Sequence, residues 1–211
     1  PLAQILGATA LGALLLTACA PAPQPEAPAA APEAAAPAAV EAPAAAPAQP
    51  ADPLDAAIAG SWRTPDNVAR DGARRPAETL RFFGLTPTQT VVEITPGGGW
   101  YTEILAPYLK DGGRYVGAII DPSKQANERS RDYYAKSNEG LRTLLAGAPE
   151  AYGRAELVEF DVAAPVLGPA GSADLVLTFR NVHNWRGNGH AEGLFKAFFD
   201  VLKPGGVLGV V

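Results

Sequence analysis

The stretch that most constrains the fold is "TVVEITPGGGWYTEIL", which covers residues 90–105. Its first part, Thr90–Thr95, is rich in β-branched residues and predicts a buried strand. Its last part opens a helix that we predict over Tyr101–Leu109. The glycines between them let the backbone turn sharply and approach a ligand closely, because they have no Cβ. The stretch therefore predicts a strand and a helix joined by a turn suited to ligand contact.

The rest of the domain repeats this alternation. Further strands are predicted at Tyr115–Ile120, Glu156–Phe160, Ala173–Phe179 and Gly206–Val211. Further helices are predicted within "RRPAETLRFFGL" and over residues 127–145 and 192–202, where "LKPGG" ends the last one. The pattern indicates an α/β fold: a Rossmann-like, doubly wound, mostly parallel sheet with helices on both faces. Ligands of such sheets bind at the carboxyl ends of the strands.

Three kinds of ligand turn compete for the glycines. A phosphate loop needs a lysine followed by Ser or Thr, and "GGGWYTE" has no lysine. A dinucleotide fingerprint needs a glycine at the sixth position counted from Gly97, and that position is Thr102. The acid Glu93 just before the glycines would repel a pyrophosphate but suits a ligand that carries an ammonium or sulfonium group. This argument favours S-adenosyl-L-methionine as the cofactor.

Three ordered segments resemble class I S-adenosylmethionine-dependent methyltransferases. "VVEITPGGGWYTEIL" is similar to their first motif, "ADLVLTFRNVHNW" to their fourth strand and the loop after it, and "LKPGGVLGVV" to the segment entering their fifth strand. The region from about Arg63 to Val211 resembles a group of bacterial predicted methyltransferases, in which "RRPAETLRFFGL" also precedes the first motif.

The resemblance implies a set of cofactor-binding residues. The methionine part would be held by Glu93, Gly97, Gly98 and Gly99, the ribose by Asp121 and the adenine by Asp161. Thr95 stands where the commoner motif has its first glycine, so the turn must differ there. The alternative interpretation is structural: Glu93 caps a helix, the glycines make a tight turn and Asp161 is a turn residue.

The segment "FRNVHNWRGNGH" after the fourth predicted strand is our candidate for catalysis. The resemblance implies that the methyl acceptor approaches here, with Arg180, Asn181 and His183 as catalytic residues. His183 has the chemistry of a base, and Trp185 or Tyr101 would line the acceptor pocket or lie against the sulfonium. The alternative is a loop that caps the sheet through hydrogen bonds from Asn and His.

Composition excludes some partners and sites. The net charge of −5 and the absence of a basic run argue against sequence-independent nucleic-acid binding. His183 and His190 are the two histidines, and no cysteine lies in the domain, so we predict no metal site. We expect a small-molecule acceptor.

The N-terminal part of the sequence predicts export. "PLAQILGATALGALLLTAC" has the apolar run of a secretory signal, too short to span a membrane. Its end, "LTAC", resembles the lipobox of bacterial lipoproteins, in which Cys19 would be lipidated. We therefore expect a lipoprotein signal peptide at 1–19, an Ala/Pro-rich disordered tether at 20–56 and the domain at 57–211. An ordinary secretory signal with an incidental cysteine is the alternative.

The ends of the sequence lead to one more expectation. The chain begins with Pro1 and stops inside the apolar run "GGVLGVV". We expect a fragment whose C-terminal strands are truncated, so that the domain is incomplete there.

Two functions follow as hypotheses. The first is an S-adenosylmethionine-dependent methyltransferase, lipid-anchored in the cell envelope on the periplasmic side of a bacterial membrane. The second is a catalytically inactive envelope lipoprotein that uses the methyltransferase fold as a ligand-binding module, because S-adenosylmethionine is made in the cytoplasm. A nicotinamide-dependent oxidoreductase is a third possibility, which Thr102 and Glu93 disfavour.

Overall fold

The computed structural model describes residues 52–211 of the chain. The expected signal peptide, nearly all of the expected tether and Cys19 lie outside the described residues. The packed domain begins with helix α1, Pro53–Ile58, whose Leu54 is 2% exposed. The expected domain start at residue 57 therefore falls inside a helix that already belongs to the core.

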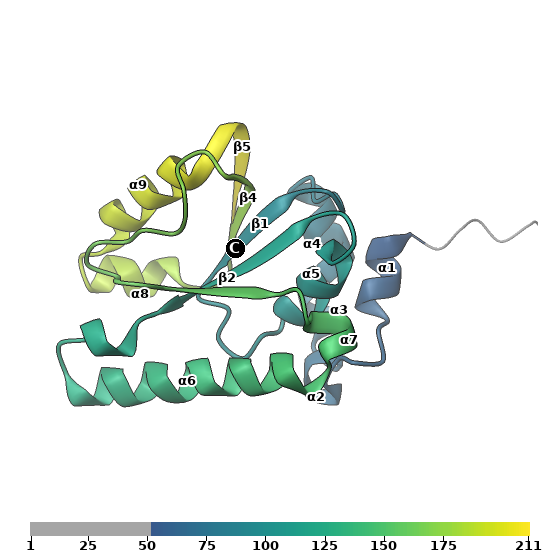
Figure 1. The fold of residues 1–211 in the computed structure, drawn as a ribbon, viewed down its shortest axis with the longest axis horizontal. Helices are drawn as coiled ribbons and strands as arrows, with labels where there is room; N and C mark the ends of the chain where they lie inside the picture. The colour runs from purple at the N-terminus through teal and green to yellow at the C-terminus, as the bar shows by residue number, and fades with distance from the viewer. Residues whose placement is uncertain (1–51) are drawn as a thin grey trace, which may run out of the picture. The chain divides into compact units, whose positions relative to one another are not determined.

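The described residues form one parallel five-stranded sheet in the order β3-β2-β1-β4-β5. Its strands, drawn in Figure 1, are β1 (Thr90–Ile94), β2 (Arg114–Ile120), β3 (Glu156–Phe160), β4 (Ala173–Thr178) and β5 (Leu202–Val210). Helices cover both faces, so the predicted α/β doubly wound class is confirmed. β1 is buried along nearly its whole length, as expected for a central strand with a helix layer on each side.

One face of the sheet is covered by α1, α4, α5 and α7. Here α4 is Pro76–Phe82, α5 is Thr102–Leu109 and α7 is Pro149–Tyr152. Their apolar side chains pack with Val91, Leu175 and Leu177 from the strands. On the other face lie α8 (Val182–Gly187) and α9 (Ala191–Val201), which appear together in Figure 1. Leu194 and Phe198 of α9 are fully buried against this second face.

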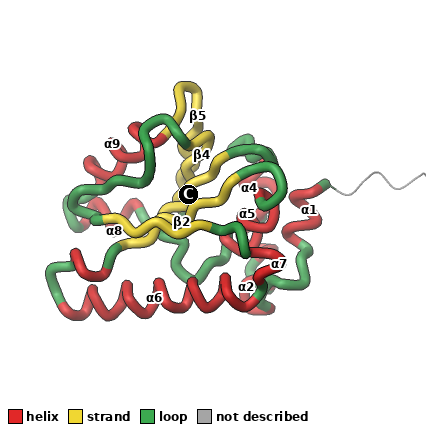
Figure 2. The backbone as a smooth tube through the Cα atoms, in the orientation of Figure 1, coloured by secondary structure: helices red, strands yellow, loops and turns green. Residues whose placement is uncertain are grey.

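Helix α6, Glu128–Gly147, follows β2 and the short helix η1, Pro122–Lys124. The tube in Figure 2 shows its long course along the bottom, from beneath α8 to α7. Most of α6 faces solvent, and Leu141 and Asn138 are its buried residues. The Asn138 side chain donates to the carbonyl of Ile120 at the end of β2 (2.9 Å), which ties the helix to the carboxyl edge of the sheet.

The N-terminal helices are fastened to α5 by buried polar groups. Two short helices, α2 (Pro65–Val68) and α3 (Asp71–Arg74), lie between α1 and α4. Arg63, with a fully buried side chain, pairs with Asp71 (2.6 Å) and lies 3.7 Å from Glu103 of α5. Glu103 also accepts from the Thr64 hydroxyl (2.9 Å). Removing one partner would leave a buried charge uncompensated. For buried pairs, this lowers the free energy of unfolding by about 3–5 kcal/mol.

Two segments differ from their predicted form. The loop expected after the fourth strand contains a six-residue helix, α8. The last strand begins at Leu202 rather than Gly206, because "KPGG" is accommodated in a register shift between Ala173 and Leu175 of β4. Gly205 takes a φ of 80° there, a conformation that glycine adopts without steric cost.

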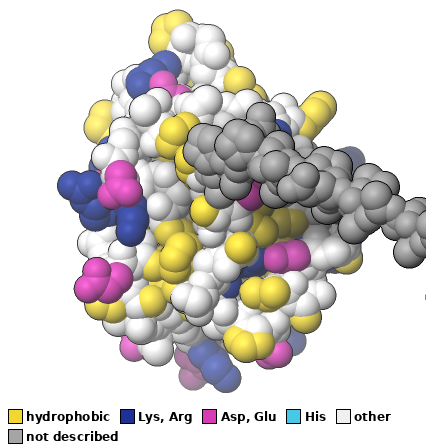
Figure 3. Space-filling model, turned by 90° about the vertical axis from the view of Figure 1, so that its right-hand side faces the viewer, with side chains coloured by type: hydrophobic (Ala, Val, Ile, Leu, Met, Phe, Trp, Pro, Cys, Tyr) yellow, Lys and Arg dark blue, Asp and Glu magenta, His cyan; other side chains and the backbone are white. Residues whose placement is uncertain are grey.

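Charged side chains on the surface lie in small mixed groups. On the face drawn in Figure 3, Lys and Arg side chains stand beside Asp and Glu, with apolar side chains between the groups. Arg81, for example, contacts both Asp52 and Asp55 at 2.7 Å. Among the helices of residues 52–211, none combines the length and the apolar character that crossing a membrane requires.

Candidate functional site

The site is built where the strand order reverses. The chain runs outward from β1 through β2 to β3 and then returns to β4 on the other side of β1. Such a switch point leaves a crevice at the carboxyl ends of the two central strands. Asn181 bridges this crevice, because its amide donates to the carbonyl of Ile94 (3.2 Å) and to the Thr178 hydroxyl (3.1 Å).

Thr95, the residue directly after β1, has a conformation normally taken by glycine. Its φ is 50°, in the left-handed region, and its hydroxyl donates to the carbonyl of Ile94 (2.8 Å). A β-branched residue in this region is strained. The departure from the glycine pattern therefore changes the residue but keeps the backbone geometry that a glycine would provide.

The three glycines have different local roles. Gly97 and Gly99 have φ of 60° and 78°, whereas Gly98 does not require a positive φ. A Cβ at Gly99 would lie 2.5 Å from Leu144 of α6, while Cβ atoms at Gly97 and Gly98 would meet nothing within 4 Å. Gly99 thus permits close packing of α6, and Gly97 and Gly98 leave open space beside the turn.

Glu93 is a buried carboxyl group behind the turn. Its Oε2 accepts from the Tyr115 hydroxyl (2.7 Å) and from the Thr102 hydroxyl (2.9 Å). Burial raises the pKa of Glu93 to about 7, although both hydrogen bonds act in the opposite direction. The side chain is 2% exposed, so Glu93 connects the sheet to α5 and reaches the crevice only at its margin.

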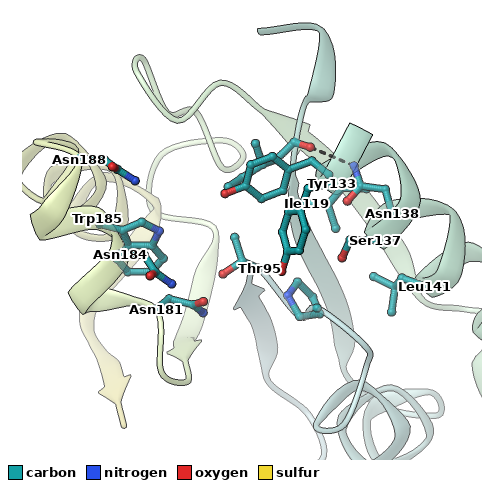
Figure 4. Close-up of a pocket in the computed structure, with 14 residues that line it drawn as sticks. Thr95, Ile119, Tyr133, Ser137, Asn138, Leu141, Asn181, Asn184, Trp185 and Asn188 are labelled. Carbon is teal, nitrogen blue, oxygen red and sulfur yellow. Dashed lines mark hydrogen bonds between the residues drawn. The ribbon is translucent and has the colours of Figure 1, made fainter. Parts of the chain in front are cut away.

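A cavity of about 330 Å³ opens at this edge between α6 and α8, and we call it the amide cavity. From the strand ends it is lined by Thr95, Pro96, Gly97, Ile119 and Ile120. From α6 it is lined by Tyr133, Tyr134, Ser137, Asn138 and Leu141. From α8 and its flanks it is lined by Asn181, Asn184, Trp185 and Asn188. Figure 4 shows the two helix groups facing each other across Thr95, and no charged side chain is part of the lining.

A second cavity of about 260 Å³ shares the turn with the first, and we call it the arginine cavity. Both cavities are lined by Thr95, Pro96, Gly97 and Asn181. The remaining lining of the arginine cavity is Arg74, Glu93, Gly98, Tyr101, Phe179 and Arg180. Two spaces of different electrostatic character therefore meet at the Thr95–Gly97 turn, one neutral and one containing two guanidinium groups.

Two of the predicted cofactor residues, Asp121 and Asp161, serve local turns. Asp121 accepts from the backbone N–H of Ser123 (2.8 Å), and hydrogen bonding by the side chain and then the backbone of Ser123 lowers the pKa of its carboxyl group. Asp161 accepts from the backbone N–H of Ala163 (2.9 Å). Neither residue lines the amide or the arginine cavity.

The predicted catalytic and acceptor residues are divided between the two cavities. Asn181 lines both, Arg180 and Tyr101 line the arginine cavity and Trp185 lines the amide cavity. Trp185 is 4% exposed and packs near Phe198, while Tyr101 is 5% exposed and stacks on Phe179 with centroids 3.5 Å apart. His183 lies on the exposed side of α8 and lines neither cavity.

The sequence reasoning missed the wall that α6 contributes. Tyr133, Tyr134, Ser137 and Asn138 follow one another at helical spacing, and this polar-aromatic stripe was the available signal. Arg74 was also missed, since its place depends on how the N-terminal helices dock. Within residues 52–211, no group of three or more His, Cys, Asp or Glu side chains is arranged to hold a metal ion.

Comparisons with solved structures give low identities and partial coverage. A SAM-dependent methyltransferase from Aquifex aeolicus is 18% identical, with a TM-score of 0.49 over 75% of this chain and 71% of that chain. A TehB-like SAM-dependent methyltransferase from Corynebacterium glutamicum is 16% identical, with a TM-score of 0.40 over 68% and 69%. The glycopeptide N-methyltransferase MtfA, solved with S-adenosyl-L-homocysteine, is 22% identical, with a TM-score of 0.45 over 63% and 46%. The chain thus spans less than half of MtfA.

The family comparison covers most of the sheet. No curated protein sequence matches the chain. A family model described as "Methyltransferase domain" matches residues 92–210, which is more than half of the 211 residues. The matched region begins inside β1 and includes the glycine turn, the carboxyl ends of all five strands and both helices that follow β4. The chain belongs to the methyltransferase domain family.

Proposed function

We propose that the protein transfers a methyl group from S-adenosyl-L-methionine to a small acceptor, and that the amide cavity holds this cofactor. The observation that best supports this proposal is the composition of the cavity. Its lining at the switch point consists of amides, hydroxyls, aromatic rings and apolar groups, and it has no charged side chain. A dinucleotide pyrophosphate is held by a complete glycine turn, which Thr102 interrupts here, and no lysine or arginine lines the cavity in its place. The neutral lining therefore supports the phosphate-free cofactor.

The aromatic residues of the cavity suit the other parts of that ligand. Tyr133 and Tyr134 come from α6, and Trp185 comes from α8 on the opposite wall. The face of an aromatic ring attracts a cation, with about 0.5–2 kcal/mol per contact. The same rings offer stacking surfaces for an adenine, while Ser137, Asn184 and Asn188 offer hydrogen-bond partners for ribose hydroxyls and ring nitrogens.

Bound there, S-adenosylmethionine supplies the methyl group. The residues of the chain have positioning tasks, because methyl transfer depends mainly on aligning the nucleophile with the methyl carbon. Thr95 and Gly97 bring backbone close to the ligand, and Asn181 fixes the distance between the ends of β1 and β4. An acceptor bound in the arginine cavity would lie next to the cofactor, because the two cavities share their lining at this turn.

Calorimetry on the chain tests the cofactor. We expect saturable binding of S-adenosylmethionine and of S-adenosylhomocysteine, and none of NADH at the same concentrations. Absence of saturable binding of both sulfur ligands would overturn the proposal. Saturable NADH binding without them would support an oxidoreductase instead.

The position of His183 favours one alternative, a binding module without turnover. This candidate base is exposed on α8 and lines neither cavity, so no histidine of the described residues stands at the site. The two functions differ in one measurement: release of S-adenosylhomocysteine in the presence of acceptor pools, followed by mass spectrometry. Release supports the enzyme, and tight binding with no release supports the module.

We also propose that the protein is lipid-anchored in the cell envelope through Cys19. The support is the apolar run that ends in "LTAC". Expression in a bacterial host with radiolabelled palmitate tests it, with Cys19→Ser as the matched variant. We expect label in the membrane fraction for the wild-type chain and none for the variant. Equal label in both would contradict lipidation at this residue.

A further inference from the structure

Two arginines line the arginine cavity without an acidic partner. Arg74 comes from the end of α3 and Arg180 from the residues after β4. None of the ion pairs within residues 52–211 includes either of them. Glu93 is the acidic residue of the lining, but its Oε2 is occupied by Tyr115 and Thr102. The cavity is therefore rich in unpaired donors and poor in acceptors.

The charges in this region repel one another. The pKa of Arg74 is lowered by burial and by the positive charges of Arg70 and Arg180. Asp71 and Tyr101 act on this pKa in the opposite direction, and an anion bound beside the two arginines would offset the repulsion between them. Arginine also presents a planar set of donors that matches carboxylate and phosphate oxygens. The arrangement has the character of an anion site.

Arg74 is held in place by the fold. Its guanidinium lies over the ring of Trp100, 4.7 Å from the centroid. Trp100 is 4% exposed, and its Nε1 donates to the carbonyl of Asn67 (2.7 Å). Because the ring is fixed, the arginine loses less conformational freedom when a ligand binds.

Arg180 is held by a strained backbone. Its φ is 61°, although it is not a glycine, and its N–H donates to the carbonyl of Val211 (2.7 Å). A residue in this region costs on the order of 1–3 kcal/mol, and such strain gathers at ligand sites. Arg180 is exposed, and it lines the cavity from its position two residues after β4.

The rest of the wall is aromatic. Tyr101 and Phe179 stack with an interplanar angle of 13°. The Tyr101 hydroxyl is protonated at neutral pH, as an ordinary tyrosine is, and burial raises its pKa further. The wall thus offers an apolar surface beside the two guanidinium groups.

From these observations, and resting on the proposed function, we propose that the arginine cavity is the acceptor subsite and that the acceptor is a small molecule with an anionic group, a carboxylate or a phosphate. Arg74 and Arg180 bind the anionic group, and the Tyr101–Phe179 wall contacts the body of the molecule. The nucleophile then faces the turn that the two cavities share.

Three probes of similar shape test the charge requirement: benzoate, phenyl phosphate and the neutral benzamide. Calorimetry at fixed ionic strength should show saturable binding of at least one anion and none of benzamide. The tighter of the two anions identifies the group that the subsite selects. Equal binding of benzamide and the anions, or no binding of either anion, would overturn the proposal.

Charge-removing variants locate the binding. Arg74→Gln and Arg180→Gln should each weaken binding of the preferred anion at least tenfold. The matched control is Arg186→Gln, on the exposed part of α8 and in neither cavity; it should leave that affinity unchanged. An unchanged affinity in both cavity variants, or an equal loss in the control, would count against the subsite.

Cofactor titrations separate this proposal from the proposed function. Arg74→Gln and Arg180→Gln should bind S-adenosylhomocysteine as the wild-type chain does, and S-adenosylhomocysteine should not displace the anion. Displacement would show that the anion shares its site with the cofactor, either in the amide cavity or through the cofactor's own carboxylate at the arginines, and it would overturn the acceptor subsite. Arginine-dependent anion binding in a chain that binds no S-adenosylhomocysteine would keep the subsite and reject the methyltransferase function.

Discussion

Thr95 and Arg180 hold left-handed backbone conformations at the ends of two neighbouring strands, with φ of 50° and 61°. Thr95 follows β1 directly and Arg180 lies two residues after β4, beyond the paired ends where Ile94 lies opposite Thr178. Two strained residues side by side at a switch point concentrate conformational strain at the crevice rather than in the core. This relationship leads to the first prediction.

Thr95→Gly should keep or increase the free energy of unfolding, by up to about 1 kcal/mol, because glycine relieves the left-handed strain but is more flexible in the unfolded chain. Thr95→Val is the matched variant. It keeps the branched side chain but loses the hydrogen bond from the Thr95 hydroxyl to the carbonyl of Ile94. Its free energy of unfolding should therefore decrease by about 1 kcal/mol. Urea denaturation measures both. A clear loss of stability in Thr95→Gly would show that the threonine is not strained.

Gly99→Ala should destabilise the fold by about 2 kcal/mol or more, since it adds left-handed strain to an overpacked contact. The new Cβ would lie 2.5 Å from Leu144. Gly98→Ala, one residue earlier and in open space, should stay within about 0.5 kcal/mol of wild type. Adding Leu144→Ala to Gly99→Ala should recover part of the loss, and strict additivity in this double-mutant cycle would argue against the contact.

The buried carboxyl of Glu93 predicts how stability depends on pH. Its pKa rises from 4.5 to about 7 in the folded protein, so between these values the folded state binds more protons than the unfolded state. Stability should therefore decrease as the pH rises from about 4.5 to about 7. The decrease should total about 3 kcal/mol, at 1.36 kcal/mol per pKa unit.

Glu93→Gln removes this titration, so its stability should depend less on pH over the same range. Urea denaturation at pH 5 and pH 8 measures the difference. Glu139→Gln, exposed on α6, is the control and should retain the wild-type dependence. An identical pH dependence in Glu93→Gln and wild type would refute the assignment to Glu93.

Tyr133→Ala should weaken S-adenosylmethionine binding about fivefold, which corresponds to the loss of about 1 kcal/mol from one exposed aromatic contact with a cation. Tyr133 is 67% exposed, so the change should not disturb folding. Phe199→Ala removes an aromatic ring that is 80% exposed and lines neither cavity, and it should bind as wild type does. Equal affinities for wild type and Tyr133→Ala would exclude this ring from the cofactor site.

The sheet could be predicted from the sequence, because its strands are short β-branched runs separated by helices. The turn at Gly97 and Gly99 could also be predicted from local sequence, because backbone with positive φ favours glycine. The start of β5 was missed because "KPGG" usually ends an element, whereas here a register shift keeps it in the sheet.

The cavity walls were harder to predict from the sequence, because they are formed by packing between segments that are distant in the chain. Asp121 and Asp161 occur at the expected strand ends, yet each carboxylate accepts from a backbone N–H two residues ahead. Short polar side chains can form such local bonds or reach a ligand, and the sequence does not distinguish the two. Arg74 reaches its cavity only because Trp100, far along the chain, provides a surface for it.

The dependence of Arg74 on the N-terminal helices has a consequence for the limits of the functional unit. The family match begins at residue 92, but α1 to α4 precede it, and Arg63 and Thr64 join that segment to Glu103 of α5. A recombinant domain cut at the family limits would begin inside β1, would lack α1 and α4, which cover one face of the sheet, and would lose one guanidinium of the arginine cavity. The proposed anion subsite therefore depends on a segment that lies outside the family match.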